Sequence, residues 1–270
     1  MPIHDQSYRH YGGGREAQGR AWVVIASAGI RSMIGKRRFL GLLLLAWLPF
    51  LGYAIYFYIR ASYAQLPLPS VTRETYRAFF DWQSAFVFFI TIWVGAGLVA
   101  NDKRANALQI YLSKPLTRSE YIAGKVSVLI VFLLLVLHML FQGNLDFIRA
   151  NLLLFPAITL YSFLQVLLAS FTMLALSSLS NSSRYVAILY AGAVFFTKAV
   201  FGVTQAVTRG TSLSWLSPTA SLEQVGNIIF HMPPIYRDTP WVVSLLVVVG
   251  VIAVSILVLE RRVRGVEVVT

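Results

Sequence analysis

Six long apolar runs alternate with short polar segments along the chain. They cover residues 39–59, 82–100, 121–141, 152–179, 185–207 and 241–259, each approximately. An α-helix rises about 1.5 Å per residue, so about 20 apolar residues cross the hydrocarbon core of a bilayer. Lipid offers no hydrogen-bond partners, and only helices and closed barrels satisfy their backbone internally. The pattern therefore predicts an all-α polytopic membrane protein with six transmembrane helices, in which residues 20–270 form a single transmembrane domain.

Proline and charge set the expected limits of the first two spans. Pro49 lies near the middle of the first run, where we expect it to kink the helix. Residues 60–80 hold two prolines and several charges, so they are interpreted as a polar loop before the second span.

The segment before the first span has the spacing of an amphipathic helix. Residues 1–19 contain three consecutive glycines and are interpreted as a flexible cytoplasmic tail. Residues 20–35 then carry apolar or small residues every three or four positions, and are too short to cross the bilayer. They are interpreted as a helix in the membrane interface, the alternative being a helix packed on a partner.

Basic residues predict the orientation of the chain. Sixteen Lys and Arg residues flank one side of the six spans and six flank the other, with Lys198 inside a span. Cytoplasmic loops are enriched in Lys and Arg, so both termini are expected in the cytoplasm. Lys125, near the start of the third span, is expected to snorkel to the lipid head groups. The formal charge of +12 is accordingly assigned to topology and membrane lipids, not to nucleic acid.

Composition excludes several chemistries. Only 13% of residues are charged, about half of the roughly 25% usual in soluble domains. With no cysteine the chain has no disulfide, thiolate metal site or cysteine nucleophile, and its four scattered histidines form no metal site. No catalytic residue, bound cofactor or metal is expected in this chain.

The segment between the second and third spans predicts a short helix outside the bilayer. Apolar positions at Leu108, Tyr111 and Leu112 follow the charged turn Asp102, Lys103 and Arg104, which indicates an amphipathic helix over residues 102–113. Pro115 ends this helix, because the residue before a proline is disfavoured in helical geometry.

Thr117 and Glu120 then form a capping box that begins the third span. The predicted unit is a rigid knob attached to two spans and able to transmit force from a soluble partner. An ordinary solvated loop with a good cap is the alternative.

This segment resembles the signature of ABC transporter permeases of the type-2 exporter class. The resemblance covers about thirty residues and rests on Gly95, Gly97, Asp102, Leu108, Leu112-Ser113-Lys114-Pro115, Arg118 and Gly124-Lys125. The family usually has Glu at the position of Asp102 and Gly-Thr at that of Asn106-Ala107.

The resemblance implies a membrane-spanning permease subunit of an ATP-driven exporter in the cell membrane of a bacterium. It implies a translocation path formed with a second permease copy, and two copies of a separate ATPase subunit that bind ATP and Mg²⁺. The coupling helix, 102–113, would dock on the ATPase, and residues 211–231 would form short re-entrant or extracellular helices over the path. The chain itself has no phosphate-binding loop.

Lys198 is the one basic residue near the centre of a predicted span. A charge at the bilayer centre costs about 2.5 to 3.5 kcal/mol on insertion scales, so such residues often mark a substrate path. The alternative is a lysine that snorkels outward. Other functions considered are a non-transporting membrane scaffold and an intramembrane enzyme, although the spans hold no catalytic pair for the latter.

Overall fold

The protein is all-α and has six helices that are long and apolar enough to cross a membrane. The computed structural model describes residues 21–63, 65, 67, 69–107, 116–137 and 154–263, and no strand occurs among them. The six membrane-spanning segments are Arg37–Arg60, Arg73–Arg104, Arg118–Leu137, Leu154–Leu179, Ser183–Thr208 and Trp241–Arg262. The prediction of a multi-pass helical membrane protein is confirmed.

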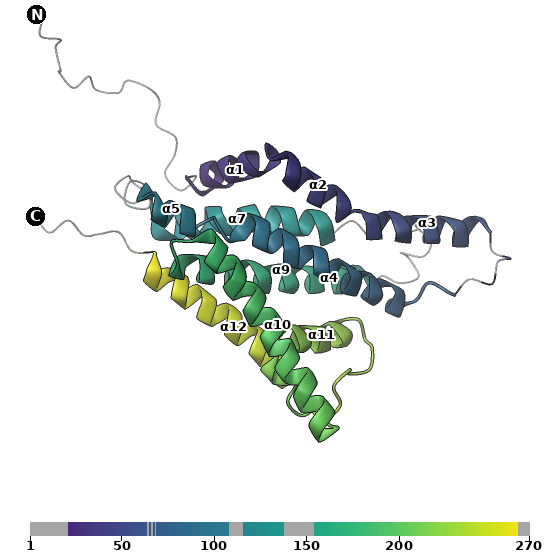
Figure 1. The fold of residues 1–270 in the computed structure, drawn as a ribbon. Helices are drawn as coiled ribbons and strands as arrows, with labels where there is room; N and C mark the ends of the chain where they lie inside the picture. The colour runs from purple at the N-terminus through teal and green to yellow at the C-terminus, as the bar shows by residue number, and fades with distance from the viewer. Residues whose placement is uncertain are drawn as a thin grey trace, which may run out of the picture.

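The described helices run mostly along one long axis (Figure 1). In chain order they are α1 (Ala21–Ile34), α2 (Arg37–Leu45), α3 (Leu48–Ser62), α4 (Arg73–Gly95), α5 (Ala100–Arg104), α7 (Arg118–Leu137), α9 (Leu154–Leu179), α10 (Ser183–Thr208), the 3₁₀ turn η2 (Ser214–Leu216), α11 (Pro218–Ile229) and α12 (Trp241–Arg262). Helix α5, the start of α1 and the end of α12 lie at one end, here called the α5 end. The start of α4 and helix α11 lie toward the other, the α11 end.

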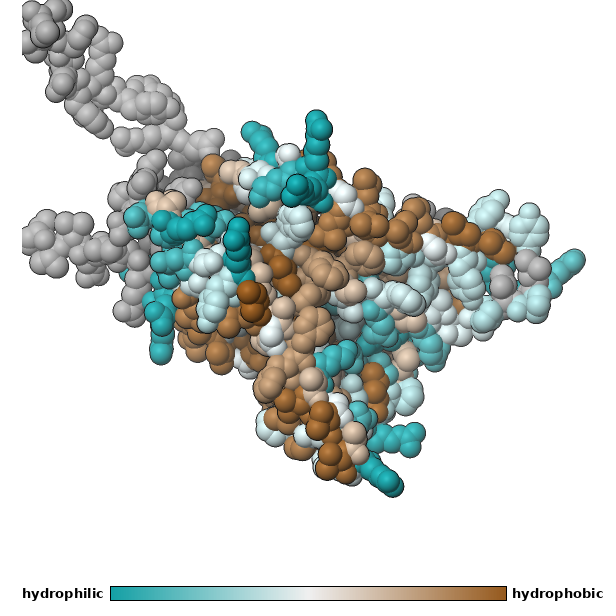
Figure 2. Space-filling model, viewed as in Figure 1, coloured by the Kyte–Doolittle hydropathy of each residue, from teal (hydrophilic) through white to brown (hydrophobic). Residues whose placement is uncertain are grey.

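Helices α4, α7 and α9 form the centre, whereas the spans that contain α3, α10 and α12 are largely exposed, although α12 packs on α9 and α11. Central side chains such as Phe79, Leu129 and Leu133 are fully buried. By contrast, α10 exposes Ile188 and Phe196, and Figure 2 shows apolar surface over this helix. Exposed apolar surface of this extent is unusual in soluble monomers but suits contact with hydrocarbon.

The first span is broken, close to the kink expected from Pro49. Helix α2 ends at Leu45 and α3 begins at Leu48 with Pro49 in its first turn. Proline has no N–H to donate, so the preceding turn loses a hydrogen bond. The buried Gln83 of α4 donates to the carbonyl of Ala46, at 2.9 Å, and also to that of Val136 on α7, at 3.1 Å. The side chain of Gln83 therefore connects the break between α2 and α3 to both α4 and α7.

The second helix starts earlier than its apolar run predicts. Helix α4 begins at Arg73 rather than Trp82, so the expected loop over 60–80 is wrong in its last part. The hydroxyl of Thr75 accepts the backbone N–H of Thr72 at 3.1 Å and caps the helix. The charged first turns are helical because they also bury Tyr76, Phe79 and Phe80 against the bundle.

Helix α1 packs along the first half of α7. The two helices approach closely at Gly124, where a Cβ atom would lie 2.9 Å from the carbonyl oxygen of Trp22 and 2.8 Å from Cβ of Ile25. Small residues permit such close contact between membrane helices. The helix expected over 20–35 is therefore present over 21–34, and the tail 1–19 lies outside the described residues.

We predict that Gly124→Ala lowers the free energy of unfolding by about 1–3 kcal/mol, because the added methyl group meets backbone that cannot rotate away. The matched control is Gly41→Ala on α2, where a Cβ atom meets nothing within 4 Å. Denaturation of the detergent-solubilised protein measures both variants. Equal stability of the two variants would contradict the close α1–α7 contact.

Candidate functional site

The junction between α4 and α5 is held by one serine from α9. The Oγ atom of Ser177 accepts the backbone N–H groups of Val99, at 3.2 Å, and Ala100, at 3.0 Å, and donates to the carbonyl of Ala96 at 3.0 Å. Ser177 is fully buried. Backbone groups left over at helix ends need such partners when water is absent. One buried side chain of α9 thus binds the backbone between the end of α4 and the start of α5.

Asp102 joins α5 to α7. Its Oδ2 atom lies 2.7 Å from Nζ of Lys125 and accepts the hydroxyl of Tyr121 at 2.8 Å. The side chains of Asp102 and Lys125 are only 18% and 13% exposed. The ammonium of Lys125 therefore has a partner within the protein, a shielded carboxylate on α5, which the expectation of snorkelling did not include.

Lys103 joins α5 to α9. Its Nζ atom donates to the carbonyl of Ser178, in the last turn of α9, at 2.8 Å. A cation at this position is favoured by the negative end of the helix dipole. Arg104 is exposed. Of the three consecutive charges, the first two face neighbouring helices and the third faces outward.

The helix expected over 102–113 is interrupted. Helix α5 starts at Ala100, which places Asp102 in its first turn as expected for an acid, but it ends at Arg104. Asn106 then has a φ of 52°, in the left-handed region that asparagine tolerates better than most residues. A single helix from Asp102 onward is therefore wrong. Leu108, Tyr111 and Leu112 lie outside the described residues.

The cap of the third span is confirmed. The backbone N–H of Glu120 donates to Oγ1 of Thr117 at 3.2 Å, and the N–H of Thr117 donates to Oε2 of Glu120 at 3.0 Å. Helix α7 accordingly begins at Arg118, and its described part ends at Leu137. The α5 end therefore combines three features: the α4–α5 junction bound by Ser177, the contacts of Asp102 and Lys103 with α7 and α9, and the capped start of α7.

Lys198 meets a carboxylate that the sequence reasoning missed. Its Nζ atom lies 3.5 Å from Oε1 of Glu223 on α11, and the two side chains are 60% and 29% exposed. The other carboxylate oxygen of Glu223 accepts the hydroxyl of Tyr236 at 3.1 Å. Burial and the charge of Glu223 raise the pKa of Tyr236, so this tyrosine remains a donor at neutral pH. The partner of Lys198 lies 25 residues away in sequence, in a segment whose position only the fold determines.

The segment after α10 includes the short helix expected there and is tied together by side-chain to backbone hydrogen bonds. Helix α11 is capped by the hydroxyl of Ser217, which accepts the N–H of Ala220 at 3.3 Å. Gln224 bonds both backbone groups of Tyr236. Asp238 accepts the N–H of Thr211 at 2.7 Å and its hydroxyl at 2.9 Å, and these two bonds lower the pKa of Asp238.

Arg77 is a buried cation in the segment 60–80, which the sequence predicts to be a loop. It is 4% exposed, pairs with Asp81 one turn later and donates from Nε to Oδ1 of Asn227 on α11 at 3.2 Å. Its guanidinium lies 5.0 Å from the ring centroid of Tyr161 on α9. The spacing of Arg77 and Asp81 by four residues was the available signal, since it favours an ion pair on a helix.

No metal site is found in the described part of the chain, where His, Asp and Glu form no group of three that would hold an ion. A comparison with models of known protein families finds no match, and neither does a search of curated proteins.

We predict that Lys125→Met destabilises the protein by about 1.5–3 kcal/mol, because it leaves the shielded carboxylate of Asp102 without its charged partner. Adding Asp102→Asn to that variant should restore part of the loss. The control is Arg104→Gln, at the exposed end of α5, with no expected change. Unfolding in detergent measures all three, and a Lys125→Met variant as stable as the control would refute the cross-link.

The lowered pKa of Asp238 predicts a pH dependence. A carboxylate whose pKa is lower in the folded protein stabilises the fold at pH values above its pKa in the unfolded chain, which is about 3.9. That stability is lost as the pH falls through the lower pKa of the folded state. Hydrogen exchange at the Thr211 amide, corrected for its intrinsic rate, should stay protected at pH 6 and lose protection below about pH 4.

The matched control is the Ala220 amide, which a neutral hydroxyl caps. Its protection should not change over this range. Parallel loss at both amides would indicate general unfolding instead of titration of Asp238.

Proposed function

We propose that this chain is the permease subunit of an ATP-driven ABC exporter of the type-2 class. The supporting observation is the attachment of α5 to three other helices at one end of the bundle. It continues from α4, bonds α7 through Asp102 and bonds α9 through Lys103. An element joined in this way moves only together with the spans that it contacts.

The proposed mechanism uses these links as a mechanical connection. A separate ATPase subunit, present in two copies, binds ATP and Mg²⁺ and docks at the α5 end and the residues that follow it. Closure of the ATPase dimer would push α5, and the three linked helices would shift together. Packed helices transmit such displacements because their interior is close-packed and resists compression.

The charges divide between internal and external roles in this proposal. Asp102 and Lys103 fasten α5 to the permease, so their substitution would disturb folding. Arg104 is exposed and is the described residue best placed to contact the ATPase. The rest of the proposed docking surface, including Leu108, Tyr111 and Leu112, follows in the chain.

A second copy of this chain completes the translocation path in the proposed assembly. The path passes α10 and α11, where Lys198 presents a 60% exposed ammonium with Glu223 beside it. Both termini and the α5 end face the cytoplasm of a bacterial cell, and the α11 end faces outward. The basic residues that flank the two sides support this orientation.

The decisive experiment separates docking from stability. The tagged chain is purified from membranes of its native host, and Mg²⁺-dependent ATP hydrolysis that elutes with it is measured. We expect the double variant Arg104→Glu/Leu108→Asp to reduce the copurifying ATP hydrolysis about tenfold, because its association with the ATPase is weaker by about 1.4 kcal/mol. Its thermal midpoint should not change.

Lys103→Met should instead lower the thermal midpoint. The control is Arg237→Glu, the same charge reversal at an exposed position of the α11 end, which should retain activity. If no ATP hydrolysis elutes with the wild-type chain, or the α5 double variant retains it, the proposal is wrong.

The absence of cysteine gives an independent test of orientation. A single cysteine introduced at Arg104 should react with an impermeant thiol reagent only after the cell membrane is opened. One introduced at Arg237 should react in intact cells. The reverse pattern would exclude docking of a cytoplasmic ATPase at α5.

A further inference from the structure

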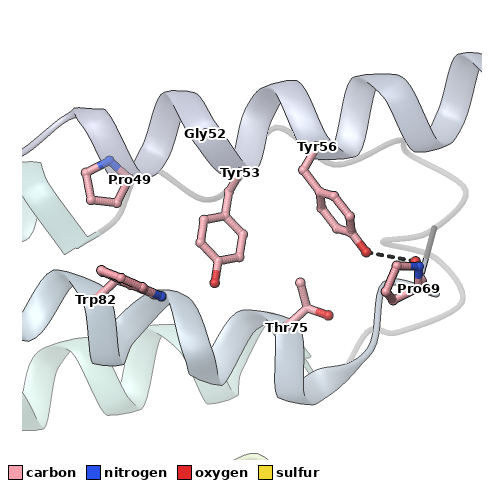
Figure 3. Close-up of a pocket in the computed structure, with 7 residues that line it drawn as sticks. All are labelled: Pro49, Gly52, Tyr53, Tyr56, Pro69, Thr75 and Trp82. Carbon is pink, nitrogen blue, oxygen red and sulfur yellow. Dashed lines mark hydrogen bonds between the residues drawn. The ribbon is translucent and has the colours of Figure 1, made fainter.

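A groove separates α3 from the start of α4 (Figure 3). It has a volume of about 480 Å³, within the roughly 300–1,000 Å³ typical of small-molecule sites. Its lining residues are Pro49, Gly52, Tyr53, Tyr56, Pro69, Thr75 and Trp82. Tyr53 and Tyr56 point from α3 toward α4. A Cβ atom at Gly52 would meet nothing within 4 Å, so this residue leaves room on the α3 wall.

The surroundings of the groove limit what can fill it. Both walls belong to membrane-spanning segments, and α3 beside it exposes Leu48, Leu51 and Ile55. The groove therefore opens toward the hydrocarbon, where acyl chains are the available molecules. An empty groove would forfeit dispersion contacts on both walls, whereas a chain in it recovers them.

The two ends of the groove differ in polarity. Pro49 and Trp82 form the end inside the spans, while Tyr56, Thr75 and Pro69 lie where the chain leaves them. There the hydroxyl of Tyr56 donates to the carbonyl of Pro69 at 2.7 Å. The first turn of α4, which supplies Thr75, also carries the exposed side chains of Arg73 and Glu74. An arginine binds phosphate and a carboxylate binds an ammonium, so this end complements a zwitterionic head group.

We propose that the α3–α4 groove binds one zwitterionic phospholipid. One acyl chain lies between Gly52 and Trp82, the phosphate contacts Arg73 and the ammonium contacts Glu74. Apolar packing alone gives little preference for the groove over bulk lipid, because both are equally apolar. Selectivity therefore comes from the fit of the chain and from the head-group contacts. This site is independent of the exporter proposal.

The test uses quenching of tryptophan fluorescence by lipids with brominated acyl chains. Two proteins keep a single tryptophan of the six, Trp82 in the groove or Trp93 on the same helix, which is also exposed. In vesicles with increasing brominated phosphatidylethanolamine, Trp82 should reach half-maximal quenching at an at least roughly threefold lower mole fraction than Trp93, a difference of about 0.65 kcal/mol. Brominated phosphatidylglycerol should show no such preference.

Two substitutions locate the lipid. Gly52→Leu should fill the groove and remove the preference at Trp82, while Gly41→Leu, also at an open glycine but outside the groove, should leave it. Arg73→Gln should abolish the difference between head groups and keep quenching by the acyl chain.

Three outcomes overturn the proposal. The first is quenching of Trp82 that follows bulk composition for both lipids, as at Trp93. The second is a preference that survives Gly52→Leu. The third is a groove covered by a second copy of the chain, shown by weak quenching of Trp82 that increases when Gly52→Leu dissociates the dimer.

Discussion

Backbone groups freed where a transmembrane helix breaks must find partners within the protein, because hydrocarbon supplies none. Two buried polar side chains meet this constraint. Ser177 satisfies three backbone groups at the α4–α5 junction, and Gln83 donates to the carbonyl of Ala46 at the α2–α3 break. Without them, these turns would leave unpaired groups in an apolar interior, at a cost of about 1–3 kcal/mol each. The position of α5, and hence the proposed coupling to an ATPase, depends on the first of these breaks.

Charged residues in the described spans also have partners within the protein, since five of them take part in three ion pairs. Asp102 pairs with Lys125 at the α5 end, and Arg77 with Asp81 and Lys198 with Glu223 toward the α11 end. The pairs differ in exposure. The Asp102–Lys125 pair is shielded and suits a fixed joint, whereas Lys198 is largely exposed and its contact with Glu223 is longer. This contrast agrees with the proposed exporter, in which the α5 end that contacts the ATPase is rigid and the translocation path beside Lys198 is more accessible.

Contacts between residues close together in sequence were the predictable part of the candidate site. The Thr117–Glu120 cap lies within four residues and forms as expected. The partners of Ser177 and Lys198 could not be predicted, because contacts between helices depend on their rotation and depth, which hydropathy does not specify. Arg77 was missed for a related reason. A charged segment is usually a loop beside a span, but here one helical face of it is buried against α9 and α11.

The six spans, the break near Pro49 and the short helix after the fifth span could be read from the sequence, since length, apolarity and proline chemistry act locally. The packing of the helices was needed to show that α5 is short, that α1 lies on α7 and that Asp102 and Lys103 face neighbouring helices. These features are not local because alternative orientations of a helix in lipid differ little in energy. Hydrocarbon accepts any apolar face, so buried polar contacts and close packing at glycine select one arrangement.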